Sequence, residues 1–259
     1  MDLLLSTGAS LLLLVVIFGP LERAFPARRG QGALRPELHI DLLFFLGQYL
    51  AFAGLAVALL SAFAGVVEPL IPASVGEAAA AMPLWLRGVV ALAVGDVLVY
   101  WFHRACHRYP LLWRFHAVHH SAEHLDWLAA HREHPVDGIL TQLVINVPAI
   151  VLGLPFAAVG GLVVLRGLWA IFVHSNTRLP LGPLRVLFGA PELHHWHHAR
   201  VRETRHNFAN LAPWVDLVFG TYHCPEGEER YPLGLPDPWP RGYFAQLLRP
   251  LGIYRRERP

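Results

Sequence analysis

The chain alternates between long apolar runs and short polar stretches. Three apolar runs cover Leu3 to Phe18, Ile40 to Val67 and Leu84 to Phe102. Because a helix rises about 1.5 Å per residue and the hydrocarbon core of a bilayer is about 30 Å thick, runs of this kind predict membrane helices. Asp2 precedes the first run, whereas a signal peptide starts with basic residues, so we interpret this run as a first membrane helix.

A fourth apolar stretch runs from Ile139 to Val173. Turn-forming residues interrupt it near Gly153, Pro155, Gly160 and Gly161. Each arm holds only about 14 to 17 residues, which is marginal for a full span. We therefore expect a helical hairpin that enters and leaves on one side of the membrane and places His174 beside the other histidines. An arginine is costly in lipid, so Arg166 is expected to face protein or to reach toward the interface.

The polar stretches differ in their arginine content. Residues 22–37 hold four arginines, whereas residues 68–82 hold none. Because cytoplasmic loops are enriched in arginine, the first stretch is predicted to face the cytoplasm. The third helix then returns to that side and delivers His103 there. The Pro-, Arg- and aromatic-rich chain from Ser175 onward is expected to form a cytoplasmic cap.

The composition favours a membrane protein. Hydrophobic residues make up 54% of the 259 residues and charged residues 15%, compared with about 25% charged residues in soluble domains. A net charge of only +2 and the absence of a basic stripe argue against nucleic-acid binding. The use of Arg without Lys, with abundant Ala, Gly, Pro and Leu, favours a bacterial source and therefore a bacterial inner membrane.

These patterns together predict an all-α integral membrane protein. About four transmembrane helices, a helical hairpin and a cytoplasmic helical cap are expected to form one domain over residues 1–259. Within it, we expect N-terminal membrane helices in 1–95, a histidine-motif catalytic region in 96–222 and a cytoplasmic C-terminal tail in 223–259.

Histidine has the most informative distribution of any residue type. Fourteen of the 16 histidines fall between His103 and His206. The two cysteines, Cys106 and Cys224, are too few and too far apart for a thiolate metal motif. The clusters are HRACH, HAVHH, one histidine after the hairpin, and HHWHH, and the candidate ligands in them are His103, His107, His116, His119, His120, His174, His194, His197 and His198.

The spacing and the number of these histidines point to metal chemistry. Spacings of i, i+3 and i+4 place imidazoles on one face of a helix. Neutral imidazole binds iron, zinc, copper or nickel, so the spacing alone does not choose the metal. One zinc ion takes about four ligands, so nine candidates suit two metal ions and exceed the need of one.

The segment from Asp96 to Tyr222 resembles the sterol desaturase / fatty acid hydroxylase superfamily of membrane proteins. The matching segments, in the expected order, are DVLVYWFHRACH, LLWRFHAVHHSAEHLDWLAAHREHP, FVHSNTRLPLGPL and PELHHWHHARVRETRHNFANLAPWVDLVFGTY. The resemblance implies a di-iron centre held by the nine histidines above, O2 as co-substrate, and hydroxylation or desaturation of a lipid such as a fatty acid or a sterol-like lipid. The sequence contains no GxGxxG motif and no cytochrome-type domain, so a ferredoxin or cytochrome-like reductase system is expected to donate the electrons.

Three further residues are assigned to the catalytic machinery. Asp96 lies seven residues before His103 on the same helix face, where it is expected to hold a ligand imidazole. His134 matches a family position and is expected either to support a ligand or to be a reserve ligand. Asn207, together with Asp216, matches positions that tie the cap to the histidine helices. The sequence leaves open the roles of His131, His195 and His206, and assigns none to His39 and His223.

Two other functions stay open at this point. A membrane zinc hydrolase would use a zinc-bound water as its nucleophile, but the HExxH motif is absent and histidines are in surplus. A non-catalytic metal-binding or transport protein would place its ligands near the middle of the membrane, whereas these ligands are predicted at the cytoplasmic ends of the helices. Metal analysis combined with an O2-consumption assay separates the three functions.

Overall fold

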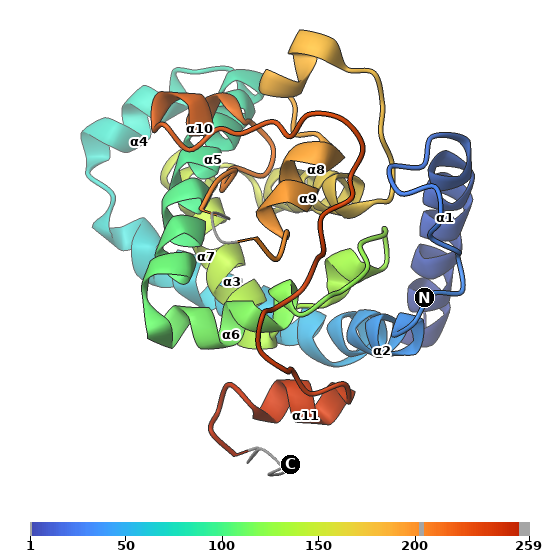
Figure 1. Ribbon diagram of the computed structural model, residues 1–259. Helices are drawn as coiled ribbons and strands as arrows, with labels where there is room; N and C mark the ends of the chain where they lie inside the picture. Colours follow the sequence, from blue (N-terminus) through green and yellow to red (C-terminus); the bar gives the residue numbers. More distant parts are fainter. Residues whose placement is uncertain (1, 202–204, 254–259) are drawn as a thin grey trace.

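The computed structural model describes residues 2–201 and 205–253, and these residues form an all-helical fold (Figure 1). Within the described residues, β-type pairing is limited to two isolated bridges, Pro26 with Thr177 and Ala199 with Leu233. The predicted all-α class is therefore confirmed. The end of the predicted C-terminal tail, residues 254–259, lies outside the described residues.

Four helical segments are long and apolar enough to cross a membrane, as predicted. They are α1 (Leu3–Ala24), the continuous segment Leu38–Leu70, α5 (Leu84–Arg108) and α8 (Phe156–His174). The second segment is built from α2 (Leu38–Gly47), the π-helical turn η1 (Gln48–Phe52), α3 (Ala53–Val67) and the 3-10 turn η2 (Glu68–Leu70). Large apolar side chains remain exposed along these segments, as expected of helices whose outer faces meet lipid.

The predicted hairpin is formed by α7 (Pro135–Val151) and α8. Its turn contains Gly153 at a φ of 60°, a left-handed conformation that glycine adopts without a Cβ clash. Gly160 and Gly161, which the sequence suggested as interruptions, are helical residues of α8. Packing outweighs their weak helix propensity, so this arm reaches 19 residues and is a candidate span in its own right.

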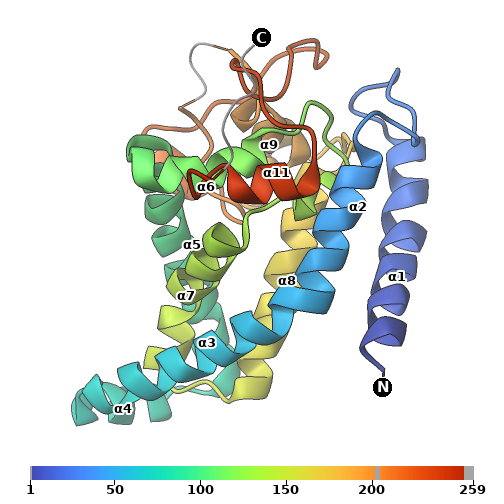
Figure 2. The ribbon, with the colours of Figure 1, turned by 90° about the horizontal axis from the view of Figure 1, so that it is seen from below.

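The shorter helices gather at the two ends of the spans (Figure 2). At the end opposite the N-terminus lie α6 (Pro110–His120), α9 (Pro191–His197) and α11 (Tyr243–Leu248), whereas α4 (Ala73–Ala80) lies at the other end. The remaining short elements are η3 (Ala129–His131), η4 (Gly182–Val186) and α10 (Trp214–Val218). The end that carries α6, α9 and α11 is called the cap below.

Separate apolar clusters hold the spans and the cap together. Leu60, Ala91 and Ile150 belong to a cluster that packs α3, α5 and α7 against one another. Phe18 and Phe45 belong to a second cluster, which joins α1 and α2 to α8. A third cluster joins α2 and α6 and is covered by partly buried side chains of α11. The helix ends that carry the histidines are thereby fixed on several sides.

Candidate metal centre

Four elements deliver the nine predicted ligands to the cap end of the spans. The end of α5 carries the first pair, α6 carries three histidines, α8 ends on His174, and α9 with its C-cap carries the last three. Because α6 and α9 each begin with a proline at the first helical turn, where a missing N–H costs nothing, both helices start at fixed points. The histidine spacing then places the imidazoles of each helix on one face.

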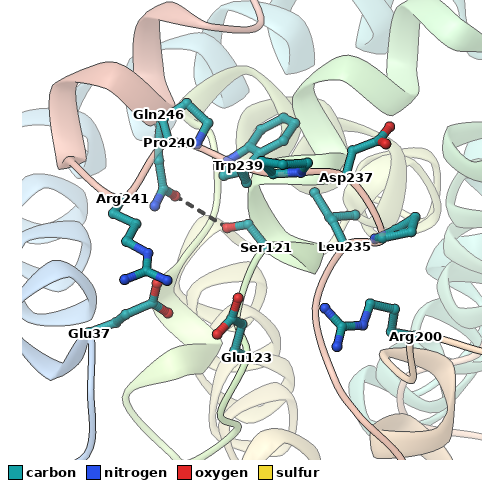
Figure 3. A pocket seen from close by; sticks show the side chains of 12 residues that line it. Glu37, Ser121, Glu123, Arg200, Leu235, Asp237, Trp239, Pro240, Arg241 and Gln246 are labelled. Carbon is teal, nitrogen blue, oxygen red and sulfur yellow. Dashed lines mark hydrogen bonds between the residues drawn. The ribbon is translucent and has the colours of Figure 1, made fainter. Parts of the chain in front are cut away.

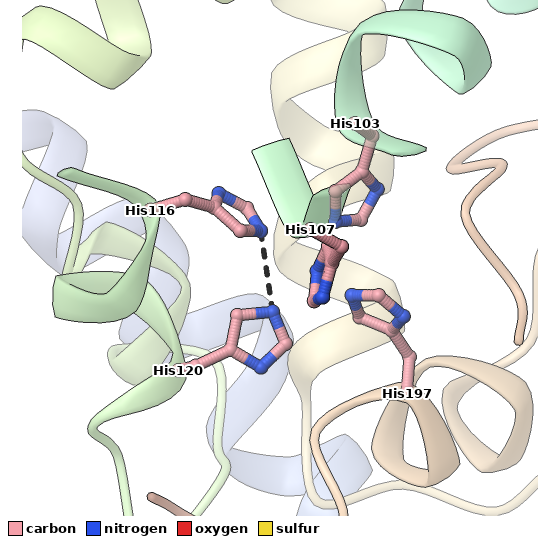
Figure 4. A group of neighbouring side chains, drawn as sticks. All are labelled: His103, His107, His116, His120 and His197. Atoms are coloured by element: carbon pink, nitrogen blue, oxygen red, sulfur yellow. Dashed lines mark hydrogen bonds between the residues drawn. The ribbon is translucent and has the colours of Figure 1, made fainter. Parts of the chain in front are cut away.

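The histidines separate into two groups. Group A consists of His103, His107, His116, His120 and His197, whose ligand nitrogens all lie within 4.8 Å of one another (Figure 4). Group B consists of His119, His174, His194 and His198 under the same limit. Together the two groups contain all nine predicted ligands and, among the described residues, no other histidine.

The two groups lie side by side. The rings of His120 in group A and His198 in group B stack with centroids 4.3 Å apart and an interplanar angle of 19°. In group B, the Nε2 atom of His174 lies 3.0 Å from that of His119 and 2.9 Å from that of His194. Such close clustering of imidazole nitrogens is the arrangement that a shared cation would draw together.

Unpaired imidazole nitrogens in group A also fit metal binding. The Nε2 atoms of His103, His107 and His197 are buried and have no hydrogen-bond partner within the described residues. A buried nitrogen without a partner is costly, and a metal ion at the centre of group A would satisfy all three. The donor type alone does not distinguish iron from zinc, copper or nickel.

The electrostatics keep these imidazoles neutral, as metal ligation requires. Burial and the neighbouring His116 lower the pKa of His119 to about 3. Burial lowers the pKa of His197 to about 3 as well. The pKa values of His120 and His198 are also held far below the ordinary value, mainly by burial. Their nitrogens therefore remain available as lone-pair donors at neutral pH.

Backbone carbonyls and one carboxylate orient the rings of group A. His103 donates from Nδ1 to the carbonyl of Phe208 at 2.8 Å. His197 does the same to the carbonyl of His206 at 2.8 Å. Since a carbonyl only accepts, the proton sits on Nδ1 of each ring and leaves Nε2 free for a metal.

Asp137 was not anticipated from the sequence. Its carboxylate accepts from Nδ1 of His116 at 2.8 Å, and it is 3% exposed. It lies in the first turn of α7, two residues after the end of HREHP. The sequence did hold a signal for it: a carboxylate stands at the start of an apolar helix that follows a histidine motif. A carboxylate is expensive to bury without a partner, so a nearby histidine could have been expected to pair with it.

Group B is oriented by different contacts. His119 donates from Nδ1 to the carbonyl of Arg132 at 3.1 Å. His174 donates to the carbonyl of Ala170, one turn earlier in α8, at 2.6 Å.

His195, whose role the sequence left open, supports group B. Its Nδ1 lies 2.7 Å from the carboxylate of Glu229, and its Nε2 lies 3.2 Å from the carbonyl of His174. Burial alone would lower the pKa of His195, but the charge and hydrogen bond of Glu229 outweigh it and raise that pKa. An imidazolium that donates from both nitrogens fits both contacts and leaves no lone pair for a metal. Glu229 was likewise missed, because it lies outside every histidine motif.

Asp96 is buried in α5, but its partner is an arginine. Arg166 donates from Nη1 to the Asp96 carboxylate at 3.0 Å and from Nη2 to the carbonyl of Leu92 at 2.6 Å. Within the described part of the chain, no hydrogen bond joins Asp96 to a histidine, so its expected contact with a ligand imidazole has no counterpart here. Arg166 faces protein, one of the two placements expected for it.

His134 uses both ring nitrogens away from the two groups. Its Nδ1 accepts from the backbone N–H of Val136 and thereby caps α7, at 3.1 Å. Its Nε2 donates to the carbonyl of Leu247 in α11, also at 3.1 Å. In this arrangement His134 fixes the start of α7 and attaches α11 to it.

Asn207 and Asp216 tie the cap loop to the histidine helices. Asn207 has a φ of 58° and donates from Nδ2 to the carbonyl of Leu193 in α9 at 2.8 Å. Asp216 accepts from the backbone N–H groups of Phe208 and Ala209 at 2.8 and 2.9 Å. Because the Phe208 carbonyl holds His103, Asp216 reaches group A through one intervening residue.

The remaining histidines lie around the site. His131 contacts the Gln48 side chain through Nδ1 at 2.8 Å, which brings the π-helical turn η1 close to the cap. His206 contributes its carbonyl to His197, while its ring lies against that of His223 at 5.3 Å between centroids.

A polar pocket of about 170 Å³ adjoins the histidine motifs on the cap (Figure 3). Ser121 in its wall directly follows His120, and Arg200 follows His198 by two residues. Further charged side chains in the wall are Glu37, Glu123, Asp237 and Arg241. Charged walls would lose hydration against a hydrocarbon chain, so this pocket does not suit an acyl tail.

Comparison with known proteins gives a consistent set of matches. The family model described as "Fatty acid hydroxylase" matches residues 88–221, more than half of the chain. The ornithine lipid hydroxylase OlsE of Rhizobium tropici is 33% identical over 173 residues, which cover 65% of this chain and 51% of that protein. No solved structure matches the chain.

Two further relatives are named for other lipids. Alkylglycerol monooxygenase of Homo sapiens is 29% identical over 144 residues, 55% of this chain and 32% of that protein. The Delta(7)-sterol-C5(6)-desaturase of Nicotiana tabacum is 31% identical over 153 residues, 56% of this chain and 54% of that protein. The chain thus spans about a third to a half of the length of these curated relatives.

Proposed function

Because the chain belongs to the fatty acid hydroxylase family, we propose that it is a membrane-bound di-iron oxidoreductase that uses O2 to hydroxylate a C–H bond of a lipid. The observation that carries this proposal is the pair of buried, all-histidine groups at one end of four apolar spans. Two groups of five and four imidazoles supply enough donors for two metal ions and more than one can use.

The lipid class follows from the relatives and from the spans. The relatives are named for an ornithine lipid, an alkylglycerol and a sterol, and we extend to this chain only their common class, a membrane lipid. His103, His107 and His174 lie at the cap ends of two apolar spans, so this part of the centre is close to the level at which bilayer lipids end. Desaturation of the same C–H position is the alternative outcome of this chemistry.

In this proposal, the chain's own residues position the ligands and exclude water. Two bound irons would supply the O2-dependent oxidation, with electrons from a ferredoxin or cytochrome-like reductase partner. Asp137 and the carbonyls of Phe208 and Arg132 hold Nδ1 protons and keep Nε2 turned inward. His120 and His198 are 5% and 1% exposed, so little water reaches the stacked pair between the groups.

We further propose that the cap faces the cytoplasm of a bacterial cell. Residues 22–37, which carry four arginines, connect α1 to α2 at the cap end, and the positive-inside rule assigns that end to the cytoplasm. Thiol labelling in intact and permeabilised cells tests this. Cys224 is partly exposed and should react only after permeabilisation, while Cys106 is buried and serves as the silent control.

A combined assay tests the activity. Purified, iron-loaded protein should hold about two irons per chain, consume O2 when an electron donor is present, and yield a lipid product that has gained one oxygen atom. A product that has instead lost two hydrogen atoms would indicate desaturation. One zinc per chain that survives iron-replete expression, with lipid hydrolysis and no O2 uptake, would establish the zinc hydrolase instead. Tight metal binding without any turnover would favour a carrier.

A further inference from the structure

The carbonyl that orients His119 belongs to a residue whose side chain is fully buried. Arg132 is 0% exposed. Its Nε donates to the Asp41 carboxylate at 2.5 Å, and its Nη1 donates to Glu37 at 3.0 Å. Both acids lie at the start of α2, outside the segment that matches the family model. A ligand of group B is therefore attached, through one residue, to the N-terminal part of the chain.

The contacts continue into a closed ring. Asp41 accepts from Arg35 at 2.6 Å, and Arg35 donates to both carboxylate oxygens of Asp126 at 2.6 Å. Asp126 then caps η3 by accepting from the backbone N–H groups of Leu128 and Ala129 at 3.0 and 2.9 Å. Arg132 closes η3, because its own N–H bonds to the Ala129 carbonyl. We name this set the buried charge ring: Arg35, Asp41, Asp126 and Arg132.

The energetics make the ring a rigid support. Each of its four residues is at most 6% exposed, and buried charges are tolerated only when they are paired in good geometry. η3 is a single 3-10 turn of three residues and has little intrinsic stability. The direction of the Arg132 carbonyl therefore depends on the charges that hold the turn at both ends.

The carbonyls that directly orient His119 and His174 belong to Arg132 and Ala170, within residues 88–221. Further contacts reach group B from outside that segment. Glu22 of α1 accepts from the backbone N–H of Asn176, two residues after His174, at 2.9 Å. Glu229 acts on the His174 carbonyl through His195. The three contacts that directly orient group A come from Asp137, His206 and Phe208, none of which belongs to the buried charge ring.

We infer that the buried charge ring is a positioning device for group B, so that metal binding by group B, and not by group A, depends on Arg35 and Asp41, which precede the family segment. The inference rests on the proposed two-metal centre. Loss of one charge of the ring releases the Arg132 carbonyl and with it the orientation of His119. Group A, whose orienting contacts do not involve the ring, keeps its donors.

The experiment counts metal ions in site-directed variants of the full chain. Wild-type protein and the matched control Asp237→Asn, an exposed aspartate outside the ring, should each hold about two irons. Asp41→Asn should hold about one, and its melting temperature should fall because Arg35 and Arg132 lose a buried counter-charge. Asp96→Asn, which breaks a buried ion pair outside the ring, should also lose stability but keep about two irons. Asp41→Glu, which restores the charge, should recover part of the second iron. Adding His194→Ala to Asp41→Asn should remove no further metal, whereas adding His107→Ala should remove the remaining ion.

The outcomes separate this inference from the proposed function. A wild-type protein with one metal or none would contradict the two-metal centre and this inference with it. Two metals in wild type and two in Asp41→Asn would overturn the inference alone. Loss of both metals in Asp41→Asn, or an equal loss of metal in Asp96→Asn, would show a general effect of lowered stability and would also overturn it.

Should Asp41→Asn fail to fold, Asp126→Asn takes its place. Its amide oxygen can still cap η3 while the charge on Arg35 loses one partner. Partial loss confined to group B supports the inference, and an unchanged metal count overturns it.

Discussion

Group A and group B contain the same kind of ligand but are supported by different parts of the molecule. Group A is oriented by a carboxylate on α7 and by carbonyls of the loop at residues 206–208. Group B is oriented by the carbonyls of Arg132 and Ala170; the Arg132 side chain lies in the buried charge ring, and Glu229 contacts His195. The comparison teaches that histidine motifs define the set of candidate ligands, whereas the contacts that orient the imidazole rings of each group can come from quite different segments.

The largest expected effect is the loss of a ligand, and it should be confined to one group. His107→Ala should remove the metal of group A, and His174→Ala that of group B, because no neighbour can fill the vacant position at the same angle. Either change should abolish turnover and lower the metal count to about one per chain. Metal analysis with O2 uptake measures both effects.

The control for ligand loss is His39→Ala, since His39 is exposed and lies outside both groups. It should leave metal and turnover unchanged. Full metal and activity in His174→Ala would show that the end of α8 does not contribute to the centre.

Next in size is the buried ion pair between Asp96 on α5 and Arg166 on α8, which includes no residue of either group. Asp96→Asn leaves Arg166 buried without its counter-charge, and breaking such pairs typically costs about 3–5 kcal/mol. Thermal unfolding in detergent should show this loss, while the metal count per folded chain stays at about two. An unchanged melting temperature with selective loss of group A would mean that Asp96 acts on His103 after all.

A smaller effect, restricted to group A, is expected from Asp137→Asn. The amide cannot accept the His116 proton as strongly as the carboxylate does, and losses of this kind typically cost about 10–100-fold in metal affinity or activity. Titration with a chelator should show one metal released early and one retained. Early release of the group B metal instead would contradict the division into two independently supported groups.

The smallest expected effect is the response of stability to acid, and the two groups should share it. Burial lowers the pKa of His119 in group B and of His197 in group A to about 3, whereas an unfolded histidine titrates near 6.5. Between these values the unfolded chain binds protons that the folded chain excludes, so the stability of the metal-free protein should fall as the pH decreases below about 6.5. Denaturant unfolding at successive pH values measures the slope, and stability that rises on acidification would contradict the burial of neutral imidazoles.

Much of this architecture follows from local pattern. The apolar runs predict the spans because length and hydrophobicity alone decide whether a helix can cross a bilayer. The i, i+3 and i+4 spacings identify most of the candidate histidine ligands, because helix geometry alone places residues at these spacings on one face. His174, which has no such partner, was placed by the hairpin, and the structure brings it within 3.0 Å of His119.

The supporting contacts could not be predicted in the same way. Arg132 touches Asp41 across 91 positions of the sequence, and Glu229 meets His195 across 34. Such pairs depend on tertiary packing, which periodicity does not encode. For the same reason the contact of Asp96 with Arg166 on a neighbouring span was not predicted, and a ligand imidazole was expected in its place.

The hairpin of α7 and α8 has a consequence for biosynthesis. Both of its ends lie at the cap, so α9 is synthesised only after the last span is complete. A nascent chain that has emerged as far as residue 174 already carries four of the five ligands of group A, but only two of the four of group B. Neither group can therefore close before residues 194–198 have been synthesised, so a metal ion held by either complete group could be bound only after all four candidate spans have been translated.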